Sequence, residues 1–217
     1  MDIGTAKPPK EALAALKYHL IDVVEPSEAF SVGHFLESAH RAVEQIKHRN
    51  KPVIAVGGTA LYIKALLYGL FEGPGADEQI RTKLRQRAKT EGLNQLYEEL
   101  SKIDPLAADR ISPNDSRRII RALEVYELTG KPISSLQQQW DVRTTHDAIR
   151  NTHDAIRIIG LRREKPEENK TLNARVKRMF GAGLVDEVKS LLAEDKPLSK
   201  QARCAIGYAE LIDYLNG

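Results

Sequence analysis

The chain of 217 residues contains little cysteine and few large aromatic residues: one Cys, one Trp and four Phe. Because Cys204 is the single cysteine, an intramolecular disulfide framework and a cysteine-based zinc site are excluded. This cysteine usage is typical of a reducing compartment, so we expect a cytoplasmic protein. The length still allows a sizeable core, in one domain or in a domain with an insertion.

Long hydrophobic runs are also missing. The most apolar stretch, residues 53–71, is interrupted by two glycines and Lys64, which favours a strand, a turn and a helix over a membrane span. Met1 is followed by Asp2 rather than by a basic and then an apolar run, so no signal peptide is expected. We therefore expect no membrane partner.

Four common catalytic motifs are absent: the phosphate loop GxxxxGKS/T, GxGxxG, HExxH and GxSxG. The six histidines show no paired metal spacing. His34, Glu37 and His40 share one face of a predicted helix, but a half-buried surface stripe is favoured over a metal site. By itself the sequence presents no full catalytic set, and metal ligands stay unassigned.

Arginine is concentrated where a helix is predicted to begin, over residues 115–129. The net charge of +3 is too small to indicate a nucleic-acid partner, so local clustering matters more than the total. Arg117 and Arg121 are four apart and Arg118 and Arg121 three apart, so they share one helical face. Three guanidiniums are unfavourable beside the positive end of a helix dipole, and a bound polyanion would relieve this. A solvated charged face is the alternative.

Short apolar runs and helical patterns follow one another along the chain. Residues 52–56 form a β-branched run without polar alternation, which predicts a strand buried on both faces of a parallel sheet. Further strands are predicted at 19–24 and 156–161. Predicted helices cover residues 11–16, 31–49, 60–69, 77–103 in two parts, 115–129, 172–192 and 204–215. This order of elements predicts an α/β fold.

Residues 145–151 and 152–158 are near-copies, THDAIRN and THDAIRI. Two copies are too few for a solenoid or a coiled coil. A tandem duplication within a surface loop is the favoured interpretation.

Gly57, Gly58 and Thr59 follow the predicted strand at 52–56 and precede a predicted helix. Ligands of open α/β sheets bind at that position, where glycines let backbone N–H groups approach an anion and Thr59 offers a hydroxyl. A tight turn with a threonine cap is the alternative, and the motif alone does not decide between them.

Two further places carry residues suited to phosphate or base contacts. Arg175 and Arg178 lie three apart in a predicted amphipathic helix and could reach a phosphate, although ordinary surface arginines explain them about as well. Ile206, Gly207 and Tyr208 combine a flexible residue with an amphipathic ring suited to packing on a nucleotide. Packing of Tyr208 in the core is the favoured alternative.

Taken together, these segments resemble the tRNA dimethylallyltransferase (tRNA isopentenyltransferase) family. The strings that carry the resemblance are MDIGTAKP (1–8), HLID (19–22), VGGTALYI (56–63), DP (104–105), PND (113–115), RRIIRALEV (117–125), LTGK (128–131), GLVDEV (183–188) and AIGY (205–208). They occur in the family's order and span nearly the whole chain. The first string and the arginine helix are the most specific of them.

The resemblance implies a fold and an organisation. The expected fold is α/β, a P-loop, kinase-like core with a parallel sheet and a helical insertion, whose first strand and nucleotide-binding (ATP-binding) phosphate loop are absent from this chain. Residues 1–75 and 111–217 are expected to form the incomplete core. Residues 76–110 are expected to form the insertion, which contacts tRNA.

The resemblance also implies an activity. The family transfers a dimethylallyl group from dimethylallyl diphosphate to N6 of the adenine adjacent to the anticodon, with Mg2+ assisting departure of diphosphate. The target base is expected to flip out of its stack, as base-modifying enzymes require. The expected partner is the anticodon stem-loop of tRNA, and the protein is expected to be a monomer.

Site residues follow from the resemblance by position. Thr59 corresponds to a threonine at the reacting centre. The expected tRNA contacts are Thr59, Arg81, Arg117, Arg118, Ile119, Ile120, Arg121, Cys204, Ala205, Ile206, Gly207 and Tyr208. The expected diphosphate contacts are Gly57, Gly58 and Arg175.

The chain also departs from the family pattern. The family's phosphate loop, with its lysine and a following general-base aspartate, precedes the position of Met1, and a basic helix follows the position of Gly217. Ala209 stands where the family usually has Lys or Arg, and near Thr171 the family often has another Arg. We therefore expect a chain truncated at both ends, and an inactive remnant that at most binds tRNA is the alternative. A small-molecule kinase with the same fold is disfavoured by the arginine helix and the insertion.

Overall fold

The computed structural model describes residues 1–71, 73–137 and 156–217. The chain divides into two compact units, of which unit 1 comprises Met1–Leu66 and Ile156–Gly217, and unit 2 comprises Leu67–Ala155. The near-copies at 145–158 lie almost wholly outside the described residues, so the surface loop expected there stays a prediction.

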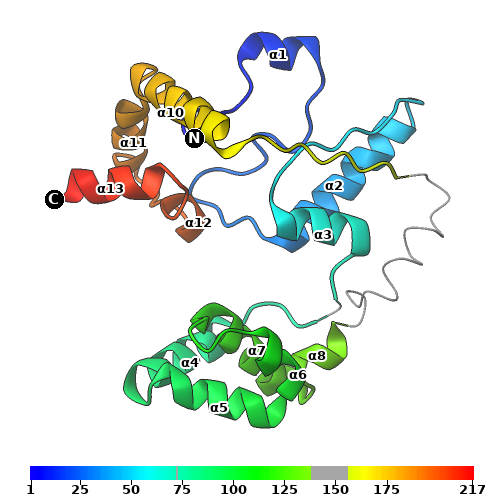
Figure 1. The fold of residues 1–217 in the computed structure, drawn as a ribbon, viewed down its shortest axis with the longest axis vertical. Helices are drawn as coiled ribbons and strands as arrows, with labels where there is room; N and C mark the ends of the chain where they lie inside the picture. The colour runs from blue at the N-terminus through cyan, green and yellow to red at the C-terminus, as the bar shows by residue number, and fades with distance from the viewer. Residues whose placement is uncertain (72, 138–155) are drawn as a thin grey trace. The chain divides into compact units, whose positions relative to one another are not determined.

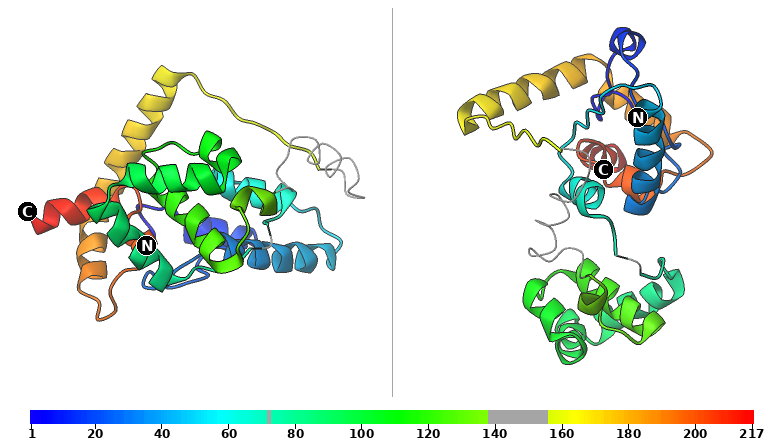
Figure 2. Two further views of the ribbon diagram at one scale, coloured as in Figure 1. Left: turned by 90° about the horizontal axis from the view of Figure 1, so that it is seen from below. Right: turned by 90° about the vertical axis from the view of Figure 1, so that its right-hand side faces the viewer.

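Unit 2 is a bundle of short helices packed on one another (Figure 1, Figure 2). The helices are α4 (Glu78–Thr90), α5 (Leu93–Ile103), α6 (Pro105–Arg110), α7 (Ser116–Thr129) and α8 (Ile133–Leu136). Helix α7 packs on α4, α5 and α8, and α5 also packs on α4 and α6. Three aspartates start helices here, because the side chains of Asp77, Asp104 and Asp115 accept backbone N–H bonds at the N-caps of α4, α6 and α7.

The core of unit 2 is made of aliphatic side chains that recur at helical spacing. Its buried members are Leu84, Leu96, Leu100, Ala107, Ala108, Ile119, Ile120, Ala122, Leu123, Val125 and Ile133. Full burial of one Leu or Ile side chain stabilises the folded state by roughly 1.5–3 kcal/mol. The carboxylate of Asp104 is also buried and accepts the N–H groups of Ala107 and Ser134, both at 2.9 Å, which joins α6 to α8.

Unit 1 contains the remaining described helices. They are α1 (Lys10–Ala15), α2 (Val32–Lys47), α3 (Ala60–Tyr68), α10 (Lys165–Gly181), α11 (Leu184–Leu192), α12 (Lys200–Arg203) and α13 (Tyr208–Asn216). Its buried core is smaller and lies between α11, α12 and α13, where Met1 and Ile3 also pack. Helices α2 and α3 meet through Phe35 and Tyr62, whose rings stack with centroids 4.1 Å apart.

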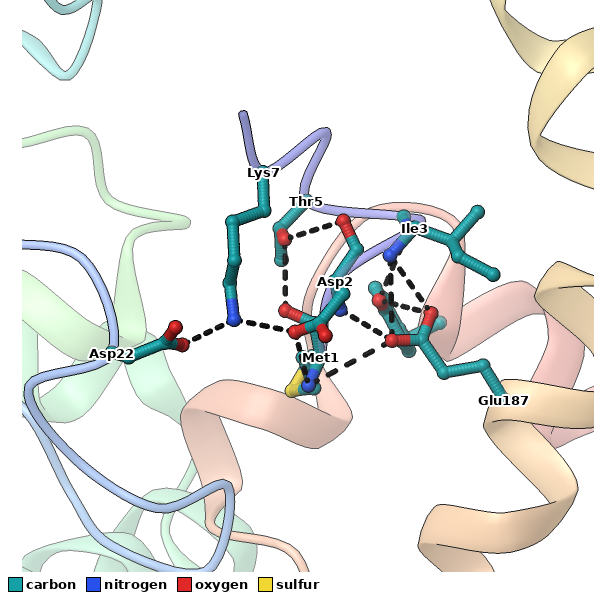
Figure 3. Close-up of polar contacts among 9 residues, drawn as sticks. Met1, Asp2, Ile3, Thr5, Lys7, Asp22 and Glu187 are labelled. Carbon is teal, nitrogen blue, oxygen red and sulfur yellow. Dashed lines mark hydrogen bonds and ion pairs between the residues drawn. The ribbon is translucent and has the colours of Figure 1, made fainter. Parts of the chain in front are cut away.

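The first residues of the chain are held against α11 and α13 (Figure 3). The carboxylate of Glu187 accepts the backbone N–H groups of Asp2 and Ile3, and it also accepts the hydroxyl of Tyr208 at 2.9 Å. The N–H of Gly4 donates to the Tyr208 hydroxyl oxygen at 3.1 Å. Burial, followed by the neighbouring Glu187, raises the pKa of Tyr208, so its hydroxyl stays protonated and donates.

Lys7 forms further ion pairs within the same region of unit 1. As Figure 3 shows, its ammonium lies between the carboxylates of Asp2 and Asp22 and pairs with both. This contact lowers the pKa of Asp2, mainly through its hydrogen bond with Lys7. Residues 1–7 are therefore fixed by polar contacts as well as by the packing of Met1 and Ile3.

The predicted parallel sheet is wrong: across residues 1–71, 73–137 and 156–217, the backbone forms no strand. Residues 52–56 and 156–161 are not helical, but neither run pairs with another in a ladder, and Ile54, Val56 and Leu161 are 80%, 93% and 95% exposed. A β-branched run favours an extended chain, yet a stable strand needs hydrogen-bonded neighbours and a buried face. In residues 19–24 the extended path is broken by bends, and Leu20 and Asp22 adopt φ of 61° and 54°.

Most predicted helices are confirmed. Ser31 caps α2 by accepting the N–H of His34 at 3.2 Å, and Gly92, with φ of 93°, separates α4 from α5. Helix α7 ends at Thr129, and Gly130 after it adopts φ of 67°, which suits glycine. The single helix predicted at 172–192 is wrong, because Gly183 adopts φ of 93° and divides the segment into α10 and α11.

Candidate functional site

The first turn of α7 presents two arginines to solvent. The side chain of Arg118 is 71% exposed, and its guanidinium lies 3.5 Å from the Asp115 carboxylate. Arg117 is exposed as well, and within the described residues no ion pair holds its guanidinium. Asp115 places a negative charge at the helix N-terminus, which offsets part of the unfavourable dipole. Both arginines are therefore available to an external anion.

The third arginine of the helix behaves differently. Arg121 donates from Nη1 to Oε2 of Glu124 at 2.7 Å and to the carbonyl of Gly75 at 3.2 Å. Its Nη2 donates to the carbonyl of Pro74 at 2.7 Å. Arg121 therefore ties α7 to the segment that leads into α4.

Arg81 of α4 meets the same carboxylate. Its Nε lies 2.9 Å from Oε1 of Glu124, and its Nη2 donates to Oε2 at 3.1 Å, a two-pronged arrangement that suits the shape of a guanidinium. The N–H of Asp77 donates to Oε1 at 2.7 Å. We call Glu124, Arg81, Arg121 and the backbone of residues 74, 75 and 77 the Glu124 cluster.

Glu124 is fully buried, at 0% exposure. Burial alone would raise the pKa of Glu124, but Arg121, the Asp77 N–H and Arg81 outweigh it, so the pKa is lowered from its ordinary value of 4.5. The side chain is therefore a carboxylate at neutral pH. Removing one partner of a buried pair costs about 3–5 kcal/mol, because the other charge stays buried and unpaired.

Ile119 and Ile120 lie between the arginines in sequence but point into the core, at 0% and 8% exposure. Their side chains fix the rotation of α7, and this rotation sets the direction in which Arg117 and Arg118 point. Contact of this segment with tRNA stays a prediction.

The Gly57, Gly58 and Thr59 segment lies in unit 1 and is exposed throughout. It leads into α3, and the carbonyl of Thr59 accepts the N–H of Ile63 at 3.0 Å. A Cβ added to either glycine would meet nothing within 4 Å, so no described neighbour requires glycine here. The roles of these three residues stay predictions.

Arg175 and the segment 204–208 also belong to unit 1. Arg175 lies on α10, which buries none of its residues. Cys204 is exposed and Ile206 is 89% exposed, whereas Ala205 packs at the edge of the core. Tyr208 is fully buried, so the core-packing alternative is confirmed for its side chain.

The structure thus brings some predicted residues together and keeps others in a separate unit. In unit 2, Arg81 and Arg121 both pair with the carboxylate of Glu124, and α7 also carries the exposed arginines of its first turn. Unit 1 carries the candidates at 57–59, 175 and 204–208. Sequence reasoning missed Glu124, because a glutamate three positions after an arginine is also common on exposed helix faces, so this spacing does not by itself mark a buried carboxylate.

In the described ranges, no group of three His, Cys, Asp or Glu side chains is arranged to hold a metal ion. No helix within those ranges is long and apolar enough to cross a membrane.

Known proteins supply the remaining comparison. A family model described as IPP transferase matches residues 1–217. The tRNA dimethylallyltransferase of Rhodopirellula baltica is 44% identical over 98% of this chain, and that of Geobacter sulfurreducens is 42% identical over all of it. A solved tRNA delta(2)-isopentenylpyrophosphate transferase from Staphylococcus epidermidis is 32% identical, with a TM-score of 0.61. A solved eukaryotic dimethylallyltransferase acting on tRNA is 26% identical, with a TM-score of 0.64.

The chain is shorter than these proteins. It spans 62% of the first relative and 68% of the second, and it covers 68% and 53% of the two solved chains. The match nevertheless extends over the full chain and includes the arginine helix and the Gly57–Thr59 segment. The chain belongs to the IPP transferase family, whose curated relatives are tRNA dimethylallyltransferases.

Proposed function

We propose that the protein acts in tRNA modification, by transfer of a dimethylallyl group from dimethylallyl diphosphate to N6 of the adenine adjacent to the anticodon. The observation that carries the proposal is the first turn of α7 in a member of this family. Exposed Arg117 and Arg118 stand there beside the guanidiniums of the Glu124 cluster. Arginines at a surface can donate hydrogen bonds to RNA phosphates, and such contacts position a protein on RNA without reading its sequence.

The chemistry of the transfer is a substitution at carbon. The adenine N6 nitrogen forms a bond to C1 of the dimethylallyl group, the C1–O bond to diphosphate breaks, and N6 loses a proton to a base. In the proposal, Thr59 contacts the reacting centre, while Gly57, Gly58 and Arg175 contact the departing diphosphate. Hydrogen-bond donors beside a leaving group stabilise the charge that develops on it.

Mg2+ enters the proposal with the diphosphate. This ion keeps several waters and is commonly held by one or two carboxylates together with substrate phosphates. The described residues do not fit a dedicated metal cage, since no cluster of three candidate ligands occurs among them. We therefore assign the ion no ligand in this chain, and no step of the proposal depends on one. A cytoplasmic monomer is part of the same proposal.

Binding of tRNA without transfer is a second candidate function. It is favoured by the exposure of Thr59 and Arg175, since no described side chain holds either of them in a fixed geometry for chemistry. Well-positioned groups are needed for transfer but not for a grip on phosphates.

A transfer assay separates the two functions. The purified chain is mixed with Mg2+, labelled dimethylallyl diphosphate and unmodified tRNA, and label in the RNA is counted. Under the main proposal, Thr59→Ala lowers the rate by about 10–100-fold, because a group at the reacting centre is lost. Thr90→Ala is the matched control, since Thr90 is exposed on α4 and, in the part of the chain that the structure describes, its hydroxyl bonds only to carbonyls of its own helix. Absence of label, together with tRNA binding that weakens steeply with salt, would leave the binding function.

A further inference from the structure

All lone-pair positions of the Glu124 carboxylate are occupied. Oε1 receives Arg81 Nε and the Asp77 N–H, and Oε2 receives Arg81 Nη2 and Arg121 Nη1. An ionised carboxylate offers about four such positions. The donors come from α4, from α7 and from the segment before α4, so one side chain sets the relative position of all three.

This arrangement does more than a stable core requires. A buried ion pair contributes little net stability compared with packed aliphatic residues of similar volume. Here the carboxylate is fully buried, but both guanidiniums reach the surface, with 27% and 28% of the Arg81 and Arg121 side chains exposed. Two like charges are thus held next to each other at the surface by one buried counter-charge.

Both guanidiniums keep hydrogen-bonding capacity in reserve. Among the described residues, Arg81 Nη1 has one contact, a long one of 3.4 Å with Glu78, whose side chain is 67% exposed. For Arg121, the bonds to Glu124, Pro74 and Gly75 use Nη1 and Nη2, and no acceptor for Nε occurs in the described part of the chain. Each guanidinium has five N–H donors, so each can accept a further anionic partner.

We infer that Glu124 is a positioning residue for RNA binding. It holds Arg81 and Arg121 so that their remaining N–H groups receive one phosphate of the tRNA backbone, next to the phosphates met by Arg117 and Arg118. The inference rests on the proposed function, because it presumes that this face of unit 2 binds tRNA. Glu124 itself touches no RNA and acts through the two arginines.

The inference can be separated from a simple effect of charge. Replacing Glu124 by Gln removes one negative charge, so electrostatics alone predicts tighter binding of RNA. Loss of positioning predicts weaker binding. Glu78→Gln is the matched control, because it removes the same charge from an exposed residue that also contacts Arg81 but leaves the Glu124 cluster intact.

The experiment measures the affinity of the full chain for an anticodon stem-loop RNA at several salt concentrations. We expect Glu124→Gln to bind about tenfold more weakly, because a charge-assisted phosphate contact is lost. Its slope of log affinity against log salt should be smaller by about one. Glu78→Gln should bind equally or up to about threefold more tightly. A merely structural role would leave the slope of the folded protein unchanged.

Circular dichroism would reveal whether Glu124→Gln folds. If it does not fold, a second pair of variants tests the same inference. Arg81→Lys keeps the charge but loses the two-pronged contact with Glu124, and we expect binding about 3–10-fold weaker. Arg85→Lys is its control, since Arg85 pairs only with Glu78 in the described residues, and its binding should change by less than about twofold.

The outcomes separate the inference from the proposed function. Folded Glu124→Gln that binds as tightly as the unaltered chain, or more tightly, overturns the inference alone. If Glu124→Gln does not fold, Arg81→Lys that binds like Arg85→Lys overturns it. Absence of RNA binding by the unaltered chain overturns both the inference and the proposed function.

Discussion

The two units of the molecule bury their apolar residues to different extents. In unit 2, leucines and isoleucines of α4, α5, α7 and α8 are almost fully buried. In unit 1, large apolar side chains such as Ile54, Val56 and Leu161 are mostly exposed. Amphipathic helices close to each other in sequence can cover one another, whereas a β-branched run needs partner strands from elsewhere. The difference teaches that the hydrophobicity of a segment does not by itself predict its burial.

Polar groups follow the same division. In unit 2 the buried Glu124 and Asp104 each bond to groups from different helices or segments. In unit 1 the comparable tie is Glu187, which together with Tyr208 holds the first residues of the chain. Each unit therefore has a carboxylate that links separate segments by hydrogen bonds, which we call its polar joint. Only the polar joint of unit 2 lies beside a large buried core.

The largest expected effect tests the contrast in burial directly. Leu123→Ala removes a side chain that is 1% exposed, so we expect the free energy of unfolding to fall by about 2–5 kcal/mol. Ile54→Ala is the matched change in unit 1, at 80% exposure, and should cost less than about 0.5 kcal/mol. Chemical denaturation followed by circular dichroism measures both. Equal costs would contradict the comparison.

A smaller effect is expected at the polar joint of unit 1. A Cβ added at Gly4 would lie 2.3 Å from Cε2 and 2.7 Å from Cζ of Tyr208. Because the ring is fully buried and cannot easily move, Gly4→Ala should cost about 1–3 kcal/mol by overpacking. Gly75→Ala is a suitable control, since a Cβ there would meet nothing within 4 Å. Equal thermal unfolding temperatures for the two variants would show that the Tyr208 ring can move away from residue 4 at no cost in stability.

The smallest expected effect is a dependence of folding stability on pH, which arises from the buried carboxylate of Glu124. The folded-state pKa of Glu124 is lowered, so its contribution to stability is present above its ordinary value of 4.5 and is lost as pH falls through the folded-state pKa. We expect the protein to unfold at lower denaturant concentration as pH falls below that value, as followed by the helical circular dichroism signal. Glu124→Gln should flatten this part of the profile, and an unchanged profile would argue that Glu124 is not ionised.

Sequence patterns predicted local structure better than they predicted packing. Caps and glycines marked α2, α4, α5 and α7, because these signals act within a few residues. The prediction of a parallel sheet was wrong because strand pairing depends on distant segments. Among the described residues, 52–56 and 156–161 have no partner strand. Glu124 was missed because a glutamate in a helix is ordinary until its burial is known. The resemblance predicted the family, but not that Arg81 and Arg121 share one carboxylate.

The bond from the Asp77 N–H to Glu124 has a consequence for hydrogen exchange. Asp77 precedes α4, and the first N–H groups of a helix have no partner within the helix and normally exchange quickly with solvent deuterium. This one donates at 2.7 Å to a fully buried oxygen, so it should exchange only when the region opens. A single slow amide at the edge of a helix would thus report how often the two arginines are released.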